Sequence, residues 1–240
     1  MLTIEAKGMD FQSLGRRLRE SEGDVRITDC LGQRFIGAGM GPRKISIHGV
    51  PGNALGAYLN GAEIEVFGSA QDAVGDTMNS GQINVFGNIG DAPGYAMRGG
   101  RIYVKGNAGY RAGIHMKAYK EHLPVLMIGG KAGSFLGEYQ AGGIIIVLGL
   151  SDDEKDIVAN FPCTGMHGGK MYLRSKCEGI HFPHQVTARP AQEADMDEIS
   201  EYINEFSDLF GYDSQTIMDA DFTVIVPDSK NPYQQMYVAN

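Results

Sequence analysis

An apolar pair spaced two residues apart recurs along this chain, and a glycine follows each pair at a fixed distance. Ile64, Val66 and Gly68 return as Ile83, Val85 and Gly87, which lie 19 residues later. The pattern occurs seven times, with its first apolar residue at Ile45, Ile64, Ile83, Ile102, Leu126, Ile145 and Met171. Side chains two residues apart on a strand point to one face, so each copy predicts a short β-strand with a buried face.

Other positions keep the same period. Glycines recur in phase, and so does a Met/Leu position at Met40, Leu59, Met78, Met97 and Met116. A period of 19 residues leaves no room for a crossover helix between parallel strands, whereas short strands joined by glycine corners are typical of a stacked solenoid. We predict a right-handed parallel β-helix of about seven coils, because the apolar spacing does not follow the six-residue period of the left-handed form.

The chain divides into three predicted segments. Residues 1–24 form a lead-in, residues 25–176 form the β-helix, and residues 177–240 form a C-terminal tail. The tail contains apolar residues at helical spacing followed by Gly211, which predicts an amphipathic helix over residues 191–211. Residues 222–227 are apolar and β-branched and predict a strand.

One predicted strand is apolar on both faces. Ile144, Ile146 and Leu148 alternate with the core residues Ile145 and Val147. A strand that is apolar on both faces is covered on both faces. We predict that the tail helix covers the outer one, and that residues 228–240 order on a partner.

Composition and charge exclude several classes of protein. The formal net charge is −8, which argues against general binding to nucleic acid or to anionic membranes. The chain opens without an apolar segment of the signal-peptide type and holds no apolar run long enough to span a membrane. Three widely spaced cysteines are typical of a reducing compartment, so we expect a cytoplasmic protein.

Motifs that suggest chemistry have simpler interpretations here. The GAGMG stretch at Gly37–Gly41 falls in phase with the repeat, which favours a solenoid turn over a dinucleotide site. Cys163 and His167 lie in the last, degraded coil, and His181 and His184 lack further ligands at metal-binding spacing. We therefore predict no catalytic, cofactor-binding or metal-binding residues in this chain.

The fifth coil carries five extra residues, and insertions in solenoids form loops that often bind. The insertion and its flank gather cationic and aromatic side chains in an otherwise acidic protein. These candidate docking residues are Arg111, His115, Lys117, Tyr119, Lys120 and His122. Two interpretations stand side by side, a docking site for a partner or anionic ligand and a tolerated insertion.

The wording of the repeat also resembles a known family. Gly56–Gly87 (GAYLNGAEIEVFGSAQDAVGDTMNSGQINVFG) and Gly133–Gly149 (GSFLGEYQAGGIIIVLG) look like the GXGXG domain, the C-terminal domain of the glutamate synthase large subunit. Two kinds of relative use this module as a separate chain: the GXGXG subunit of formylmethanofuran dehydrogenase and the third subunit of split glutamate-synthase-like complexes. Arg111–Tyr119 and Thr164–Arg174 are similar to those chains.

The resemblance implies a non-catalytic scaffold subunit of a split glutamate-synthase-like oxidoreductase, which moves the amide nitrogen of glutamine to 2-oxoglutarate. It implies glutamine amidotransferase-like and FMN-binding partner subunits that carry FMN and an iron–sulfur cluster, with no cofactor in this chain. A hetero-oligomer is expected, and self-association is left open. The alternatives are a structural role like that of the GXGXG subunit of formylmethanofuran dehydrogenase, or a free-standing enzyme with a site in the solenoid cleft.

Overall fold

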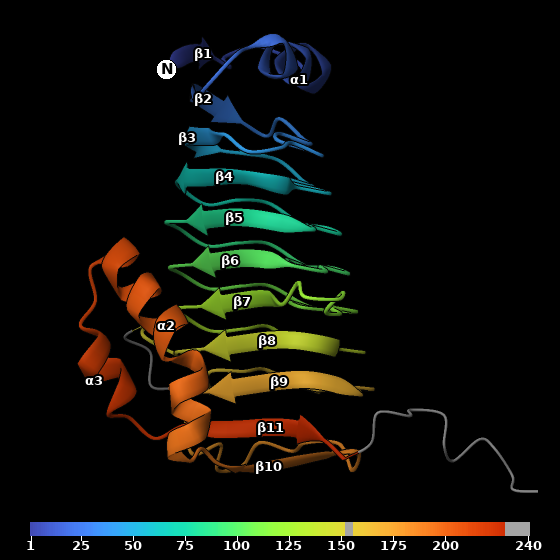
Figure 1. Cartoon of the computed structure of the whole chain (residues 1–240), viewed down its shortest axis with the longest axis vertical. Coiled ribbons are helices and arrows are strands. Elements are labelled where there is room, and N and C mark those ends of the chain that lie inside the picture. Colours follow the sequence, from blue (N-terminus) through green and yellow to red (C-terminus); the bar gives the residue numbers. More distant parts are fainter. Residues whose placement is uncertain (152–155, 229–240) are drawn as a thin grey trace, which may run out of the picture.

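A computed structural model describes residues 1–151 and 156–228, and its dominant feature is a column of stacked strands (Figure 1). Successive strands from β1 to β9 pair in parallel, each on the one before it. The bounds are β1 Leu2–Glu5, β2 Val25–Leu31, β3 Lys44–Val50, β4 Asn60–Phe67, β5 Ser80–Val85, β6 Gly100–Val104, β7 Pro124–Ile128, β8 Ala141–Val147 and β9 Gly168–Leu173. The prediction of a parallel β-solenoid is confirmed.

The solenoid has about eight turns, one more than the seven copies found in the sequence. The additional turn contains β2, in which Val25 and Ile27 lie directly over Ile45 and Ile47. This pair precedes its neighbour by 20 residues instead of 19, and the register shifts between Ile27 and Cys30. A local bulge therefore hid this coil from a fixed-period reading.

The first apolar residue of each copy forms a continuous inner row. Ile45, Ile64, Ile83, Ile102, Leu126, Ile145 and Met171 pair in register on successive strands. All are buried to within 1% of full burial. Burying one such side chain stabilises the fold by about 1.5–3 kcal/mol, so no single coil holds itself together but the stack does.

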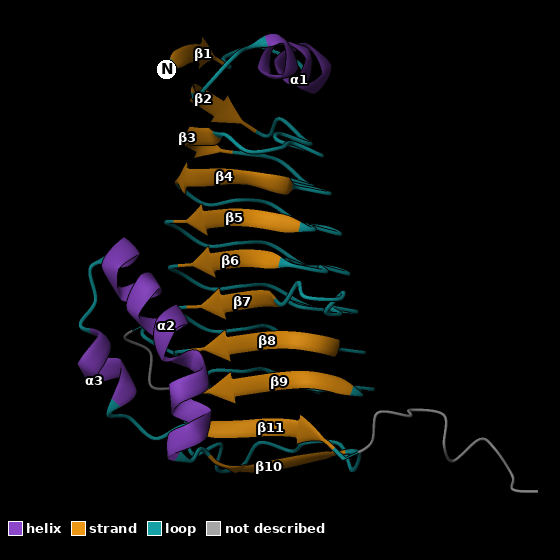
Figure 2. Ribbon diagram, viewed as in Figure 1, coloured by secondary structure: helices purple, strands orange, loops and turns teal. Residues whose placement is uncertain are grey.

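The two ends of the column are closed in different ways (Figure 2). At the N-terminal end, helix α1 (Phe11–Glu20) buries Leu14 and Leu18 against the first coils. At the other end, β11 (Thr223–Pro227) pairs antiparallel with β9, and β10 (Val186–Pro190) pairs antiparallel with β11. The predicted strand at 222–227 is confirmed, and its insertion between β9 and β10 was not foreseen.

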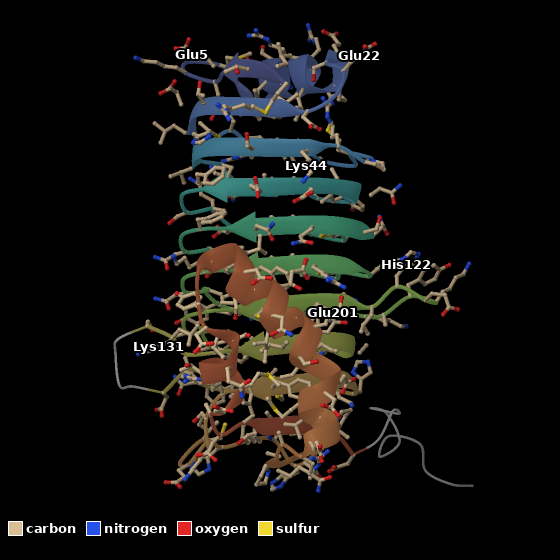
Figure 3. The ribbon with its side chains drawn as sticks, turned by 60° about the vertical axis from the view of Figure 1, so that its left-hand side comes forward. Glu5, Glu22, Lys44, His122, Lys131 and Glu201 are labelled. Atoms are coloured by element: carbon tan, nitrogen blue, oxygen red, sulfur yellow. The ribbon has the colours of Figure 1, made fainter. Side chains whose placement is uncertain are left out.

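Helix α2 (Glu193–Phe210) lies across the outer face of the lower strands (Figure 3). Its apolar residues Ile199, Ile203, Phe206 and Phe210 share one cluster with the outward side chains of β8. Ile144, Ile146 and Leu148 are thereby at most 2% exposed. The prediction that the tail helix covers this strip is confirmed. The short helix α3 (Ser214–Met218) follows, and the predicted arm beyond Asp228 lies outside the described residues.

Two tyrosines of the sheet fix α2 through two glutamates on one side of the helix. The hydroxyl of Tyr103 on β6 donates to Glu205 Oε2 at 2.7 Å, and the hydroxyl of Tyr172 on β9 donates to Glu198 Oε2 at 2.6 Å. Arg101 binds Glu205, and Lys170 Nζ binds Glu198 Oε2 at 2.5 Å, so each glutamate also has a cationic partner. Apolar burial holds the helix on the sheet, and these polar contacts set its position along the column.

The N-terminus of α2 supplies a pH-dependent contact. Arg189 donates to both carboxylate oxygens of Asp195, which also accepts from the backbone N–H of Gln192. The hydrogen bond from Arg189 lowers the pKa of Asp195 below its ordinary value. We expect Asp195→Asn to cost about 1 kcal/mol at neutral pH, the usual value of a helix cap. Because the folded pKa is depressed, this difference should shrink as the pH falls below about 4, and thermal melts from about pH 3 to 7 would measure it.

Candidate interaction surface

The insertion in the fifth coil forms a small hairpin beside the strands. Tyr119 and His122 exchange backbone hydrogen bonds of 3.1 and 3.0 Å across it. Figure 3 shows His122 projecting from the column at the level of the middle strands. The hairpin is therefore a short ordered element, as the length of the insertion suggested, and its role in docking stays a prediction.

The hairpin leans on the coil before it. The Arg98 guanidinium lies 6.0 Å from the centre of the Tyr119 ring, and Lys120 Nζ lies 5.3 Å from the same centre. A Cβ atom at Gly99 would come within 2.8 Å of His122 Cβ, so the hairpin packs closely on glycine backbone. On its other side is a shallow hollow of about 410 Å³ whose lining includes Arg101 and His122.

Arg111 and His115 lie away from the hairpin, on the turn that precedes it. Arg111 Nε donates to Glu138 Oε2 at 3.0 Å, and its guanidinium lies 5.5 Å from the Phe135 ring centre. His115 stacks on Tyr139 with 5.2 Å between ring centres. The structure thus splits the six predicted residues into two groups, Arg111 with His115 on the turn and Tyr119, Lys120 and His122 on the hairpin. Lys117 is exposed and lies between them in sequence.

Sequence analysis missed the aromatic partners of this turn. Phe135 and Tyr139 follow Arg111 and His115 by 24 residues, which is the repeat plus the insertion. Phe161 continues the row in the next coil, with 5.3 Å between its ring centre and that of Phe135. The phase of the repeat, read through the insertion, would have found Phe135 and Tyr139.

The cysteines are placed for packing. Cys30 is 3% and Cys163 0% exposed, and Cys163 Sγ lies 3.6 Å from Met171 Sδ. Burial raises the pKa of Cys30 to about 11 and that of Cys163 to about 12, and it raises the pKa of Cys177 as well. The ring of His167 meets the Gly165 carbonyl, with 3.0 Å from Nδ1 to the oxygen. This contact and the burial of Cys163 favour the packing interpretation of that coil.

We expect all three thiols to be unreactive in the native protein. A thiol reagent attacks the thiolate, and burial with a raised pKa suppresses the thiolate at about pH 8. Ellman's reagent should therefore modify Cys30, Cys163 and Cys177 only after guanidinium chloride is added. Rapid modification of any of them in native buffer would contradict their placement in the core.

The remaining motifs also have structural placements. Gly37 and Gly39 have φ values of 71° and 68° in a solenoid turn, and β3 rather than a helix follows. His181 and His184 are exposed in the loop before β10. Within residues 1–151 and 156–228, no group of three or more His, Cys, Asp or Glu side chains could hold a metal ion. No helix in these ranges is both long and apolar enough to cross a membrane.

Comparison with known proteins assigns the family. The GXGXG motif family model matches residues 23–228, so this chain belongs to the GXGXG family. It is 40% identical to the protein MJ1350 of Methanocaldococcus jannaschii over 250 aligned positions, which cover 98% of this chain and 96% of the relative.

A solved structure shares the fold. This is a chain of the formyltransferase/hydrolase complex FhcABCD from Methylorubrum extorquens, determined in complex with methylofuran. The two chains are 20% identical with a TM-score of 0.64, and the match covers 83% of this chain and 71% of the other.

Proposed function

We propose that this chain is a structural subunit of a multi-subunit enzyme whose catalytic groups lie on other chains. The observation that carries this proposal is the family match, because residues 23–228 are used by a GXGXG solenoid and its closing elements. The fold is shared with a chain of a complex, FhcABCD, which supports a subunit role. The solenoid gives such an assembly a long, rigid side on which partners can be positioned.

We further propose that the enzyme is a split glutamate-synthase-like oxidoreductase. Its partners would be a glutamine amidotransferase-like subunit and an FMN-binding subunit, with FMN and an iron–sulfur cluster on those partners. In the overall reaction one glutamine, one 2-oxoglutarate, two electrons and two protons give two glutamates, and the electrons enter through the partners' redox groups. The support is the likeness of Gly133–Gly149 to the glutamate synthase domain.

A second candidate is a structural role like that of the GXGXG subunit of formylmethanofuran dehydrogenase. It is favoured by the fold likeness to a chain of a complex that was solved with methylofuran. The two candidates differ in their partners and in the reaction of the assembly. Glutamine-dependent formation of glutamate by the intact complex supports the first, and its absence together with molybdopterin- or tungsten-containing partners supports the second.

The scaffold role predicts the behaviour of the isolated chain. We expect the purified protein to carry no flavin and to show neither glutaminase nor glutamate synthase activity. Absorbance near 450 nm and ammonia release from glutamine measure the two properties. A yellow preparation with one flavin per chain would contradict the proposal, and activity without partner subunits would favour the free-standing enzyme instead.

A further inference from the structure

The turn edge of the column places side chains on an unusual backbone that repeats from coil to coil. In the turn at residues 73–77, Ala73, Gly75 and Thr77 all have positive φ, of 57°, 67° and 51°. Non-glycine residues adopt this conformation at a cost, and for bulky side chains it is rare. The same conformation recurs in the neighbouring turns, at Ala54, Ala92, Arg111, Phe135 and Phe161 for the first position of the turn.

The identity of the residue at this first position changes along the column. Three successive coils carry alanine, at Ala54, Ala73 and Ala92, and the next three carry Arg111, Phe135 and Phe161. The fold therefore accepts a methyl group there and does not need a large side chain. Four residues later the turn holds Tyr58, Thr77 and Ala96 and then His115 and Tyr139, so alanine is accepted at that position as well.

These large side chains contribute little to the core. Phe161 is 62% exposed and Tyr139 is 45% exposed. Exposed aromatic residues on a backbone that disfavours them stabilise the chain poorly, and clustered aromatic side chains are typical of interfaces. Phe35 is an exception with a visible reason, because it occupies the first position of an earlier turn and meets Phe11 of α1 at 6.0 Å between ring centres.

The cluster is ordered before any partner arrives. Arg111 lies over Phe135, Phe135 packs on Phe161, and His115 stacks on Tyr139. The Arg111–Glu138 ion pair joins the two rows, and the backbone N–H of His115 donates to the Glu138 carbonyl at 2.9 Å. Rigid aromatic anchors lose little conformational entropy on binding, which favours affinity.

The charge of this edge is opposite to that of the whole chain. Between Ala108 and His122 there are three cationic residues, Arg111, Lys117 and Lys120, against Glu121 alone, which gives +2 in a chain of −8. Opposite charge across an interface steers association and selects the partner. The chemistry that fits this edge is therefore acidic with apolar or aromatic groups among the carboxylates.

We propose that the lower turn edge, defined as Arg111, His115, Lys117, Phe135, Tyr139 and Phe161, docks an acidic and partly apolar segment of a partner subunit. This proposal rests on the proposed function as a subunit. A second copy is the competing occupant, because α2 holds seven acidic and no basic residues. It fits less well, since four of the seven already bind groups of their own chain, namely Asp195, Glu198, Glu201 and Glu205.

The test uses variants that the fold already tolerates. Phe135→Ala combined with Phe161→Ala introduces the residue that other coils carry at the same position, and Lys117→Glu reverses a charge on exposed surface. The matched controls are Phe35→Ala, with the same backbone conformation at the far end of the column, and Arg16→Glu on the exposed side of α1. Thermal melts show that each variant is folded.

The readout is affinity for the partner subunits that purify with the tagged wild-type chain. We expect both lower-edge variants to bind the partners at least about tenfold more weakly, and both controls to bind normally. Binding of the wild type should also weaken as salt rises from about 50 to about 500 mM. If the partners bind the lower-edge variants as tightly as the wild type, the proposal is wrong while the subunit role stands.

Two further outcomes separate the remaining cases. If the wild-type chain alone self-associates in light scattering and the lower-edge variants do not, a second copy is the occupant and the proposal of a partner subunit is overturned. If no partner purifies with the chain, the subunit role fails, and labelled (Glu-Glu-Phe)₄ and (Lys-Lys-Phe)₄ peptides test the surface alone. Preference for the acidic peptide that is lost in Lys117→Glu supports the proposed chemistry, and equal binding of both peptides contradicts it.

Discussion

Ile146→Asp is expected to lower the free energy of unfolding by about 3–5 kcal/mol, the usual cost of an uncompensated buried charge. Ile146 is fully buried on the outer face of β8, in the cluster that includes Ile199, Ile203 and Phe206 of α2. An aspartate there either stays ionised in an apolar layer or takes up a proton, and both outcomes destabilise the contact with the helix. Chemical denaturation followed by circular dichroism measures the loss.

The solenoid supplies its own control for this substitution. Ser46 occupies the same outward register as Ile146, through the paired positions Glu65, Asn84, Tyr103 and Met127. It is half-buried on an upper strand and is absent from the cluster that α2 covers. Ser46→Asp should therefore cost about 1 kcal/mol or less. Equal losses at the two positions would contradict the covering role of α2.

The second large effect is expected at a glycine where two coils touch. Gly81 has a φ of 100°, and a Cβ atom there would overlap the carbonyl oxygen of Ala62 and lie 3.0 Å from its nitrogen. We expect Gly81→Ala to cost about 3 kcal/mol or more, because main chain has to move away from main chain. The denaturant midpoint of the variant measures this cost.

Gly94→Ala separates backbone strain from the collision between coils. Gly94 has a similar positive φ of 68°, but the nearest atom to its added Cβ would be Leu126 Cδ2 at 3.7 Å, which is ordinary contact. This variant should cost only the conformational strain, about 1 kcal/mol. If both glycines tolerate alanine equally, the close approach of the coils at Gly81 is wrong.

The inner face of the fold was predictable because one residue class recurs at one period. The Ile64-x-Val66 pattern states both the strand and the face that it buries, and the outward Ile144, Ile146 and Leu148 state that something covers them. Only the apolar stripe of residues 191–211 matched that strip in character. The covering helix could therefore be assigned before the structure was seen.

The ends of the column were less predictable, because local irregularities break the period there. The bulge between Ile27 and Cys30 shifts the β2 pair by one residue. The segment Val186–Pro190 holds only one buried side chain, Val186, so β10 carries little apolar signal. Its position is set by antiparallel pairing with β11, which is a non-local contact.

The candidate site was predicted in part for a related reason. Composition drew attention to the residues from Arg111 to His122, but the chain turns a corner within that stretch, and its two ends meet different neighbours. The left-handed conformation at Phe135 and Phe161 carries no residue signature, since alanine, arginine and phenylalanine all occupy it. Stacking between coils, not local sequence, assembles the aromatic rows.

Native mass spectrometry of the complex purified with a tagged full-length chain from its source tests the central claim most directly. The account predicts a stoichiometric assembly in which this chain accompanies an amidotransferase-like and an FMN-binding subunit, with the flavin on the latter. Recovery of the chain by itself under gentle conditions, without a stoichiometric partner, would contradict the subunit role.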